Sequence, residues 1–268
     1  MHNNYYFLKQ LTTTLDQKLT GHKLVECFSQ NKNELIIIFD GFIIKGHLNP
    51  SFCCLAFPDD FHRARKNSVN LFDEIIDRKV RSVTQYLNER CFSIDFEADY
   101  QLLFKMHGNR SNIILMVNGK AKDLFVNRLA KDTLLEIGQL DRQLDQSFAA
   151  FQSNDGDYKK LFPTFGKEVQ QFIDDRGYQN KSIEGKWELL EKTLIQLESG
   201  DYYVESDNGL IELKLFRIRS DSDHFRNSIE AINYFFNHYI SETTLSRERQ
   251  VVTQKLSQVL KRLERYIS

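Results

Sequence analysis

Hydrophobic residues in the first 140 positions follow one helical pattern and then a series of strand-like patterns. Leucines recur at helical spacing from Leu8 to Leu19, which predicts an amphipathic helix that ends near Gly21. Short apolar or alternating runs follow, separated by turn signals such as Asn118-Gly119. The predicted strands are 23–29, 34–40, 42–48, 52–57, 80–87, 91–96, 100–106, 112–117 and 121–126, and a short helix with Ser68 as its cap is predicted over 68–76. About nine short strands at this spacing predict an antiparallel sandwich or barrel.

The pattern changes after Gln139, where the polar stretch 141–155 is typical of a linker. Two short helices are then predicted over 158–161 and 167–173, around an apolar turn. This layout is typical of a helix-hairpin-helix, whose backbone N–H groups can meet a phosphate. Only one glycine of the usual pair is present, and simple structural packing is the competing interpretation. A helix over 183–197 and a hairpin over 202–216, with Asp207-Asn208-Gly209 as its turn, complete the region.

The last segment of the chain carries a heptad-like pattern. Apolar residues after Leu245 alternate steps of four and three positions, at Val252, Leu256, Val259, Leu263 and Tyr266, with one interruption at Arg249. This predicts the start of a coiled coil, although an ordinary amphipathic helix on its own domain competes. Because the pattern continues to Ser268 without a stop signal, we expect an N-terminal piece of a longer protein. The predicted class is therefore α+β, with a β-rich domain (1–140), a linker (141–155), a helix-hairpin-helix region with a β-hairpin (156–224) and the start of a coiled coil (225–268).

Composition narrows the functional classes. The chain has 268 residues, 41% of them hydrophobic, which is enough for a substantial core. Its longest apolar runs are too short to cross a membrane, and the opening MHNNYYFLKQ lacks the layout of a secretory signal. The four cysteines show no CxxC spacing, so we expect reduced, buried thiols in a cytoplasmic protein. No metal site and no cofactor are expected, because no ligands recur at the regular spacing of a zinc site.

Charge is distributed unevenly although the net charge is only -1. Residues 59–131 carry 13 Lys/Arg against 10 Asp/Glu, whereas residues 132–210 carry 8 against 16. Any contact with nucleic-acid phosphates is therefore expected in the N-terminal part. Two basic clusters stand out there, 78–81 and the loop 62–66 with Arg63, Arg65 and Lys66, although such clusters are usually solvated surface.

Residues 100–115, YQLLFKMHGNRSNIIL, hold the most informative motif. Two apolar runs flank the polar segment 107–112, which predicts a β-hairpin whose tip presents donors to solvent. An ordinary solvated turn is the competing interpretation. The segment HGNRSNIIL resembles the GRHSNIIL hairpin of the NFACT family, the ribosome quality-control factors of the RqcH and NEMF type, with one extra residue at the tip. Residues 228–235, SIEAINYF, also resemble the start of that family's long helix.

The resemblance implies a fold and a function. Members of the family combine a β-rich domain, similar to the N-domain of the formamidopyrimidine-DNA glycosylases, with a helix-hairpin-helix region and a coiled coil. They bind large ribosomal subunits that still carry peptidyl-tRNA, and they recruit tRNA for template-free C-terminal tailing. We therefore expect the large ribosomal subunit and tRNA as partners, no DNA substrate and no membrane. The RNA-binding residues that the hairpin implies are Lys105, His107, Asn109, Arg110, Ser111 and Asn112.

Two positions differ from the family pattern. The family's Asp-Arg pair that contacts tRNA falls on Glu89-Arg90, which keeps the arginine but lengthens the acid by one methylene. The aspartate of the family's F-D-G opening falls on Asn4, so that charge is lost. We expect Arg90 to reach RNA alongside Arg110 and the 62–66 loop. Both departures put tailing in doubt more than ribosome association.

Other functional classes remain as alternatives. Glycosylase chemistry needs an N-terminal proline followed by a glutamate, but this chain begins Met1-His2-Asn3 and has no zinc-finger cysteines. It has no P-loop, no HExxH motif and no Ser/His/Asp order, so we do not expect an enzyme. Some relatives carry the label fibronectin-binding protein A-like, which makes a surface adhesin one alternative. A cytoplasmic nucleic-acid-binding module without tailing activity is another.

Overall fold

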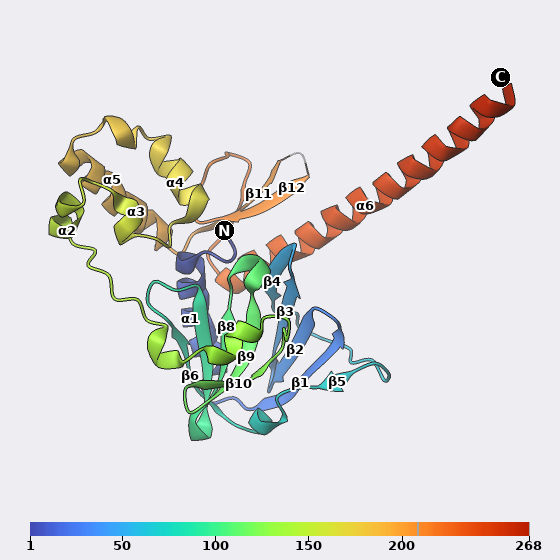
Figure 1. The fold of residues 1–268 in the computed structure, drawn as a ribbon, viewed down its shortest axis with the longest axis horizontal. Helices are drawn as coiled ribbons and strands as arrows, with labels where there is room; N and C mark the ends of the chain where they lie inside the picture. Colours follow the sequence, from blue (N-terminus) through green and yellow to red (C-terminus); the bar gives the residue numbers. More distant parts are fainter. Residues whose placement is uncertain (208, 268) are drawn as a thin grey trace.

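Two antiparallel β-sheets form the lower half of the molecule in Figure 1, and the fold is α+β, as the sequence predicts. The computed structural model describes residues 1–207 and 209–267. Within these residues one five-stranded sheet has the order β4-β3-β2-β1-β5, and a second has the order β10-β9-β8-β7-β6. The strands are β1 (Leu24–Asn31), β2 (Glu34–Phe39), β3 (Phe42–Asn49), β4 (Phe52–Ala56), β5 (Val69–Asn70), β6 (Val80–Gln85), β7 (Cys91–Phe96), β8 (Tyr100–Lys105), β9 (Asn112–Val117) and β10 (Lys120–Leu124). Phe39 and Phe96 stack with ring centroids 6.4 Å apart, so the two sheets share one core.

Most of these strands follow the hydrophobic pattern of the sequence. All nine predicted strands are present, with bounds that agree within two residues. The Asn118-Gly119 turn has positive φ at both residues, 49° and 74°, which is the geometry of a tight two-residue hairpin. Helix α1 (Tyr5–Leu19) begins at Asn4, whose side chain accepts a hydrogen bond from the backbone N–H of Tyr6 at 2.9 Å. The leucine face of α1 is fully buried against β6 and β7.

The helix predicted over 68–76 is wrong. The residues after Ser68 form the edge strand β5, which pairs with β1, and only Asp73–Ile75 make a short 3-10 turn. The Ser68 hydroxyl does not cap a helix but accepts a hydrogen bond from Nε of Arg63 at 2.9 Å. Phe72 has a left-handed backbone with φ of 57°, which a helix does not allow. Pairing with the open edge of β1 therefore decided the conformation over the local helical spacing.

Helices α2 (Phe148–Ser153), α3 (Tyr158–Leu161), α4 (Gly166–Asp174) and α5 (Ile183–Leu197) form the upper left of Figure 1. The last three confirm the helices predicted from the sequence. Helix α2 lies within 141–155, where we expected a linker. Ser147 caps it by accepting from the N–H of Ala150 at 3.2 Å, and Phe151 is fully buried 5.2 Å from the Trp187 ring. The polar texture of this segment concealed one aromatic anchor.

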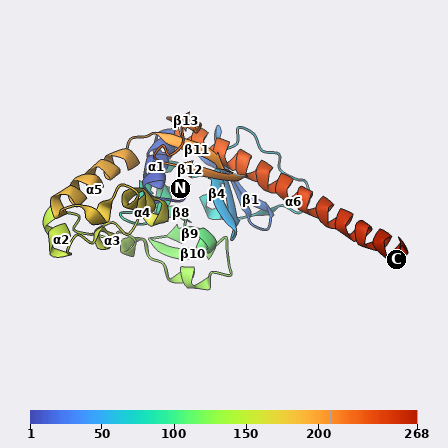
Figure 2. The same cartoon turned by 90° about the horizontal axis from the view of Figure 1, so that it is seen from above.

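A third, three-stranded sheet and the longest helix complete the chain. The sheet consists of β11 (Tyr202–Asp207), β12 (Leu210–Lys214) and β13 (Asp223–Phe225), in the order β12-β11-β13. The first two strands confirm the predicted hairpin, while Asn208 of its turn lies outside the described residues. Helix α6 (Ser228–Ile267) packs its first three turns on β4, β12 and α1 and then extends away from the body, as Figures 1 and 2 show.

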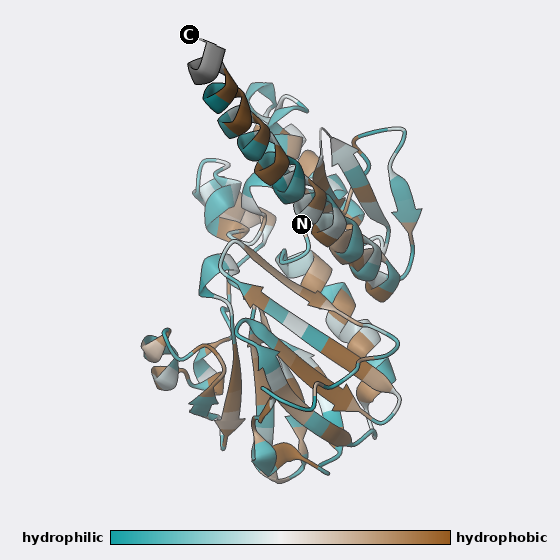
Figure 3. Cartoon of the chain, turned by 90° about the vertical axis from the view of Figure 1, so that its right-hand side faces the viewer, coloured by the Kyte–Doolittle hydropathy of each residue, from teal (hydrophilic) through white to brown (hydrophobic). Residues whose placement is uncertain are grey.

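The outer part of α6 exposes the apolar positions of the heptad pattern. Leu245, Val252, Leu256, Val259 and Leu263 are between 43% and 59% exposed. Figure 3 shows apolar patches on this outer part of the helix, beyond the sandwich. A coiled-coil partner for this face stays a prediction. None of the described helices is both long enough and apolar enough to cross a membrane.

Candidate functional site

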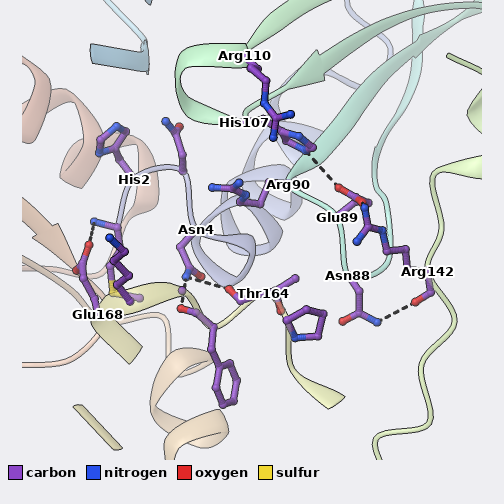
Figure 4. Close-up of a pocket in the computed structure, with 16 residues that line it drawn as sticks. His2, Asn4, Asn88, Glu89, Arg90, His107, Arg110, Arg142, Thr164 and Glu168 are labelled. Atoms are coloured by element: carbon purple, nitrogen blue, oxygen red, sulfur yellow. Dashed lines mark hydrogen bonds and ion pairs between the residues drawn. The ribbon is translucent and has the colours of Figure 1, made fainter. Parts of the chain in front are cut away.

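A cavity of about 530 Å³ lies where the end of the sandwich meets the helical region (Figure 4). Five parts of the chain enclose it: the N-terminal residues, the β6–β7 turn, the tip between β8 and β9, the segment before α2 that carries Arg142, and the segment that leads into α4. These parts are far apart in the sequence, so only the tertiary fold brings them together. Its lining includes Met1, His2, Asn4, Glu89, Arg90, His107, Arg110, Arg142, Thr164, Phe165, Gly166, Lys167 and Glu168.

The β6–β7 turn supplies a buried carboxylate with two basic neighbours. Glu89 is 8% exposed, and its Oε2 lies 3.2 Å from Nε2 of His107. Its other oxygen, Oε1, pairs with the guanidinium of Arg142. Burial acts to raise the pKa of Glu89, but the hydrogen bond with His107 and the charge of Arg142 outweigh it and lower the pKa. Glu89 is therefore an ionised, fully engaged group at neutral pH.

Arg90 and Arg110 present free guanidinium groups to the same cavity. Both side chains are exposed, and Figure 4 places them on its sandwich side. Across residues 1–207 and 209–267, neither guanidinium has a hydrogen-bonding or ion-pairing partner. Their backbones are nevertheless fixed, because the carbonyl of Arg90 accepts from the N–H of Met106 at 2.8 Å and the N–H of Arg110 bonds to His107. The cavity therefore has two cations on a fixed backbone, and their guanidinium N–H donors are unused.

The N-terminal residues make a buried wall of the cavity. The amino group of Met1 donates to the carbonyl oxygen of Leu213 and lies 3.6 Å from Oε1 of Glu168. Burial lowers the pKa of this amino group. Nε2 of His2 bonds to the carbonyl of Cys53 at 2.9 Å, and burial lowers the pKa of His2 to about 3, so its ring is neutral at physiological pH.

Asn4 joins the two halves of the cavity wall. While its oxygen caps α1, its Nδ2 donates to the carbonyls of Thr164 at 3.3 Å and Phe165 at 3.1 Å. The next residue, Gly166, starts α4 with a left-handed φ of 70°, a conformation that glycine adopts without strain. No side chain caps the N-terminus of α4, so its first N–H groups are available at the cavity, beside the exposed Lys167.

The cavity has a positive balance of charge. Four basic side chains line it, from Arg90, Arg110, Arg142 and Lys167, against the two carboxylates of Glu89 and Glu168. The Arg142 charge is partly balanced by Glu89, whereas the other three cations face the cavity or solvent. Such a site favours an anionic ligand that also offers several hydrogen-bond acceptors.

The fold brings together five of the twelve RNA-binding residues that the sequence analysis named, namely Asn4, Glu89, Arg90, His107 and Arg110. Three others are part of the core under the tip: Lys105, Ser111 and Asn112. Asn112 is fully buried and bonds to the N–H groups of Ile113 and Val126 and to Asp132, which also pairs with Lys105. Asn109 is exposed beside the cavity, where its carbonyl accepts from Arg128.

The 62–66 loop does not contribute to the cavity. Arg63 pairs with Glu26 at 2.7 Å, and its guanidinium lies 4.3 Å from the centroid of the Phe28 ring, so it holds the loop on the first sheet. Arg65 and Lys66 are exposed in that loop. They do not line the cavity with Arg90, in contrast to the grouping that we expected.

Arg142 and Lys167 line the cavity but were not predicted as site residues from the sequence. Arg142 lies in the supposed linker, and nothing in the local sequence indicates its pairing with Glu89, 53 positions earlier. Lys167 follows the predicted helix-hairpin-helix turn, so that weak motif was the one available clue to it.

Solved structures of other proteins have a similar fold. The crystal structure of the fibrinogen binding protein from Staphylococcus aureus matches with a TM-score of 0.65 at 14% identity, over 88% of this chain and 99% of that chain. The N-terminal part of the fibronectin/fibrinogen-binding protein from Streptococcus suis matches with 0.64 at 11% identity, over 87% and 98%. The N-terminal domain of fibronectin-binding protein PavA from Streptococcus pneumoniae matches with 0.52 at 12% identity, over 88% and 98%.

This chain has their fold. The match covers nearly the whole of each of the three solved chains and most of this one. At such low identity the likeness concerns the fold alone. No family model matches the sequence, and no curated protein matches it either.

Proposed function

We propose that this chain binds RNA through the cavity and acts in ribosome quality control, as the N-terminal part of an NFACT-type factor. In this role it binds stalled large ribosomal subunits with peptidyl-tRNA in the cytoplasm and recruits tRNA for C-terminal tailing. The observation that carries the proposal is the pair of guanidinium groups on Arg90 and Arg110, which have no partner among the described residues and face one cavity. The resemblance of the β8–β9 hairpin to the family's SNIIL hairpin supports it.

The cavity has the size and chemistry for a nucleotide. Its volume of about 530 Å³ falls within the roughly 300–1,000 Å³ of typical ligand pockets. An arginine can hold a phosphate or a base edge with two parallel hydrogen bonds, and the uncapped start of α4 adds backbone N–H donors beside Lys167. Because these cations are mounted at a sheet end, their backbone does not have to be ordered on binding, in contrast to cations on a mobile loop.

The departures from the family pattern have a physical account within this proposal. Glu89 is occupied by His107 and Arg142, so it does not compete with RNA for Arg90. Asn4 acts as a donor to two carbonyl groups, which an aspartate is unable to do. Arg90 and Arg110 therefore contact the RNA, and Asn4 and Glu89 are positioning residues.

The test is binding of the chain to tRNA-loaded large ribosomal subunits across a salt series. We expect Arg90→Ala to weaken binding about tenfold, because a charge-assisted contact is worth roughly 1–3 kcal/mol. Arg110→Ala should have a similar effect, and each substitution should lower the slope of log K against log salt by about one. Both side chains are exposed, so thermal melting should stay unchanged.

Lys79→Ala is the matched control. Lys79 is exposed and lies at the opposite end of the β6–β7 hairpin from Arg90, just before β6 begins. The Lys79→Ala substitution removes one positive charge, as Arg90→Ala does, but it leaves the lining of the cavity unchanged. The variant should therefore bind with the same affinity and the same salt slope as the unaltered chain. If the double variant Arg90→Ala/Arg110→Ala kept the affinity and slope of this control, the cavity would not be the RNA site.

A second candidate function is binding to fibronectin or fibrinogen. The observation that favours it is that the three structures with this fold are named as proteins that bind fibronectin or fibrinogen. Immobilised fibronectin and fibrinogen decide between the candidates: saturable binding that Arg90→Ala leaves intact, with no binding to large subunits, would favour this second function.

We also propose that the chain has no glycosylase activity, because its first residues lack the proline and glutamate of that chemistry. The amino group of Met1 is buried and held by Leu213 and Glu168, so it is poorly placed to attack a sugar. Borohydride treatment in the presence of damaged DNA should give no covalent protein–DNA adduct. An adduct that is lost when the N-terminus is blocked would contradict this proposal.

A further inference from the structure

Glu89, Cys91 and His107 bring three different metal-ligating groups together at the edge of the cavity. The backbone fixes them, because β7 and β8 pair Cys91 with Lys105 and continue with the hydrogen bond from Met106 to Arg90. Each ligand therefore extends from one of two paired strand ends. Their side-chain ligand atoms all lie within 4.8 Å of one another.

Two of the three distances between these atoms are close to the edges of a zinc tetrahedron. Nε2 of His107 lies 3.5 Å from Sγ of Cys91 and 3.2 Å from Oε2 of Glu89. Bond lengths near 2.3 Å for sulfur and 2.1 Å for nitrogen or oxygen give tetrahedral edges of about 3.6 Å and about 3.4 Å. His107 is thus already spaced from both other ligands for one ion, whereas the Cys91 sulfur and the Glu89 oxygen, which lie within 4.8 Å of each other, have to approach by up to about an ångström through side-chain rotation.

We propose that Glu89, Cys91 and His107 bind a zinc ion, with a water molecule from the cavity as the fourth ligand. The mixture of thiolate, imidazole and carboxylate suits zinc better than magnesium or calcium, which prefer oxygen ligands alone. Three protein ligands with one open position is the arrangement of zinc sites that exchange ligands with solvent. The spacing of these residues in the sequence resembles no zinc motif, which is why the sequence analysis expected no metal.

The surroundings of the cluster also suit a bound ion. Cys91 and Glu89 are 2% and 8% exposed, so the ion would be shielded on its protein side. The second oxygen of Glu89 is held by Arg142, which orients the first as outer-sphere contacts do in metal sites. Binding exchanges the thiol proton of Cys91 for the metal, and the two anionic ligands then balance the charge of the ion. The nearby arginines oppose binding, so the site should hold zinc less tightly than one without them.

The chain contains an internal comparison. His47 lies 3.2 Å from Oε1 of Glu34 on the first sheet, the same separation as in the His107–Glu89 pair. Lys45 is the third member there, at 2.8 Å from the same oxygen. A lysine ammonium is not a metal ligand, so we do not expect Glu34, Lys45 and His47 to bind a metal ion.

The experiment is metal titration of the chelator-treated chain, first with zinc against a chromophoric chelator and then with cobalt(II). We expect one equivalent to bind, and cobalt to give a thiolate charge-transfer band together with the intense visible bands of a tetrahedral site. Cys91→Ser should abolish the charge-transfer band and weaken zinc binding by more than the roughly 10–100-fold that the loss of an outer-sphere contact costs. His107→Gln should weaken it comparably, while His47→Gln should leave it unchanged.

RNA binding and metal binding are separated by the variants. Arg90→Ala should keep one equivalent of cobalt with an unchanged spectrum even where RNA binding is lost, so a failure of the proposed function would leave this result standing. His107→Gln serves as the second variant if Cys91→Ser proves unstable, because His107 is partly exposed. Failure of the unaltered chain to bind zinc or cobalt, or a cobalt spectrum without a thiolate band, would overturn the proposal.

Discussion

The residues of the β8–β9 tip are of two kinds: some are buried and stabilise the fold, and others are exposed and can contact a ligand. Asn112 is fully buried and makes its hydrogen bonds to backbone groups and to Asp132. Its role in the motif that resembles the family hairpin is therefore to stabilise the fold. Arg110, two positions away, is exposed and without a partner among the described residues. A shared motif thus combines a structural element with a contact residue, and only burial separates the two.

Asn112→Ala should destabilise the chain by about 3 kcal/mol, because it leaves Asp132 and the N–H groups of Ile113 and Val126 short of partners in a dry environment. A loss of this size corresponds to a fall in Tm on the order of 10 °C. Asn109→Ala, in the exposed neighbour of the same tip, should change stability by less than about 0.5 kcal/mol. Equal melting temperatures for the two variants would show that the buried network is not needed.

At the scale of elements, α6 consists of two parts with different roles. Its first turns bury Ile232 and Phe235, and Asn233 bonds to both backbone groups of Phe57 at 2.7 Å. In the outer part, the apolar positions from Leu245 to Leu263 are about half exposed. The first part therefore belongs to the core, and the second contributes little to it.

Removal of residues 245–268 should cost less than about 1 kcal/mol of stability, because the apolar positions from Leu245 to Leu263 are about half exposed and so bury little apolar surface. Urea unfolding of the truncated chain measures this. Truncation after Asn227 is the contrasting variant, and it should abolish cooperative unfolding because it removes the buried turns. A large loss of stability from the shorter truncation would mean that the outer helix packs on the body.

At the scale of the whole molecule, the cavity exists because α1 and the helical region are tied together. Asn4 provides this tie through the carbonyls of Thr164 and Phe165, and the amino group of Met1 adds another through Glu168. The lining of the cavity therefore depends on contacts between segments that are about 160 positions apart.

Asn4→Asp should loosen this tie while it keeps the helix cap, because a carboxylate caps α1 but repels the two carbonyl oxygens. We expect a loss of about 1–3 kcal/mol and faster amide exchange around 162–167. Asn4→Ser caps the helix without a charge and should lose only the hydrogen bonds, so its effect should be smaller. Unchanged amide exchange in both variants would mean that other contacts hold the two halves of the cavity wall together.

The sequence by itself determined most of the elements. Strand alternation, the glycine-containing turns and the leucine spacing of α1 are local properties. The pattern therefore located nine strands of the first two sheets, the β11–β12 hairpin and the helices α1, α3, α4, α5 and α6 within a few residues. It failed for β5, where pairing with β1 prevailed over helical spacing, and for α2, whose anchor Phe151 packs on the distant Trp187. Both depend on contacts with remote segments.

Only the tertiary structure decided which candidate residues form a site. The hairpin suggested Arg110 but equally Lys105 and Asn112, and the family resemblance suggested Arg90 while the basic loop suggested Arg63. Charge and polarity in the sequence do not reveal which of these side chains are buried or paired. The fold gave Arg63 and Lys105 carboxylate partners and buried Asn112. It added Arg142 from a segment with no local signal and Lys167 from the weak helix-hairpin-helix motif. A cavity is a property of the distances between strand ends, loops and a chain terminus, and these distances are fixed only when the core packs.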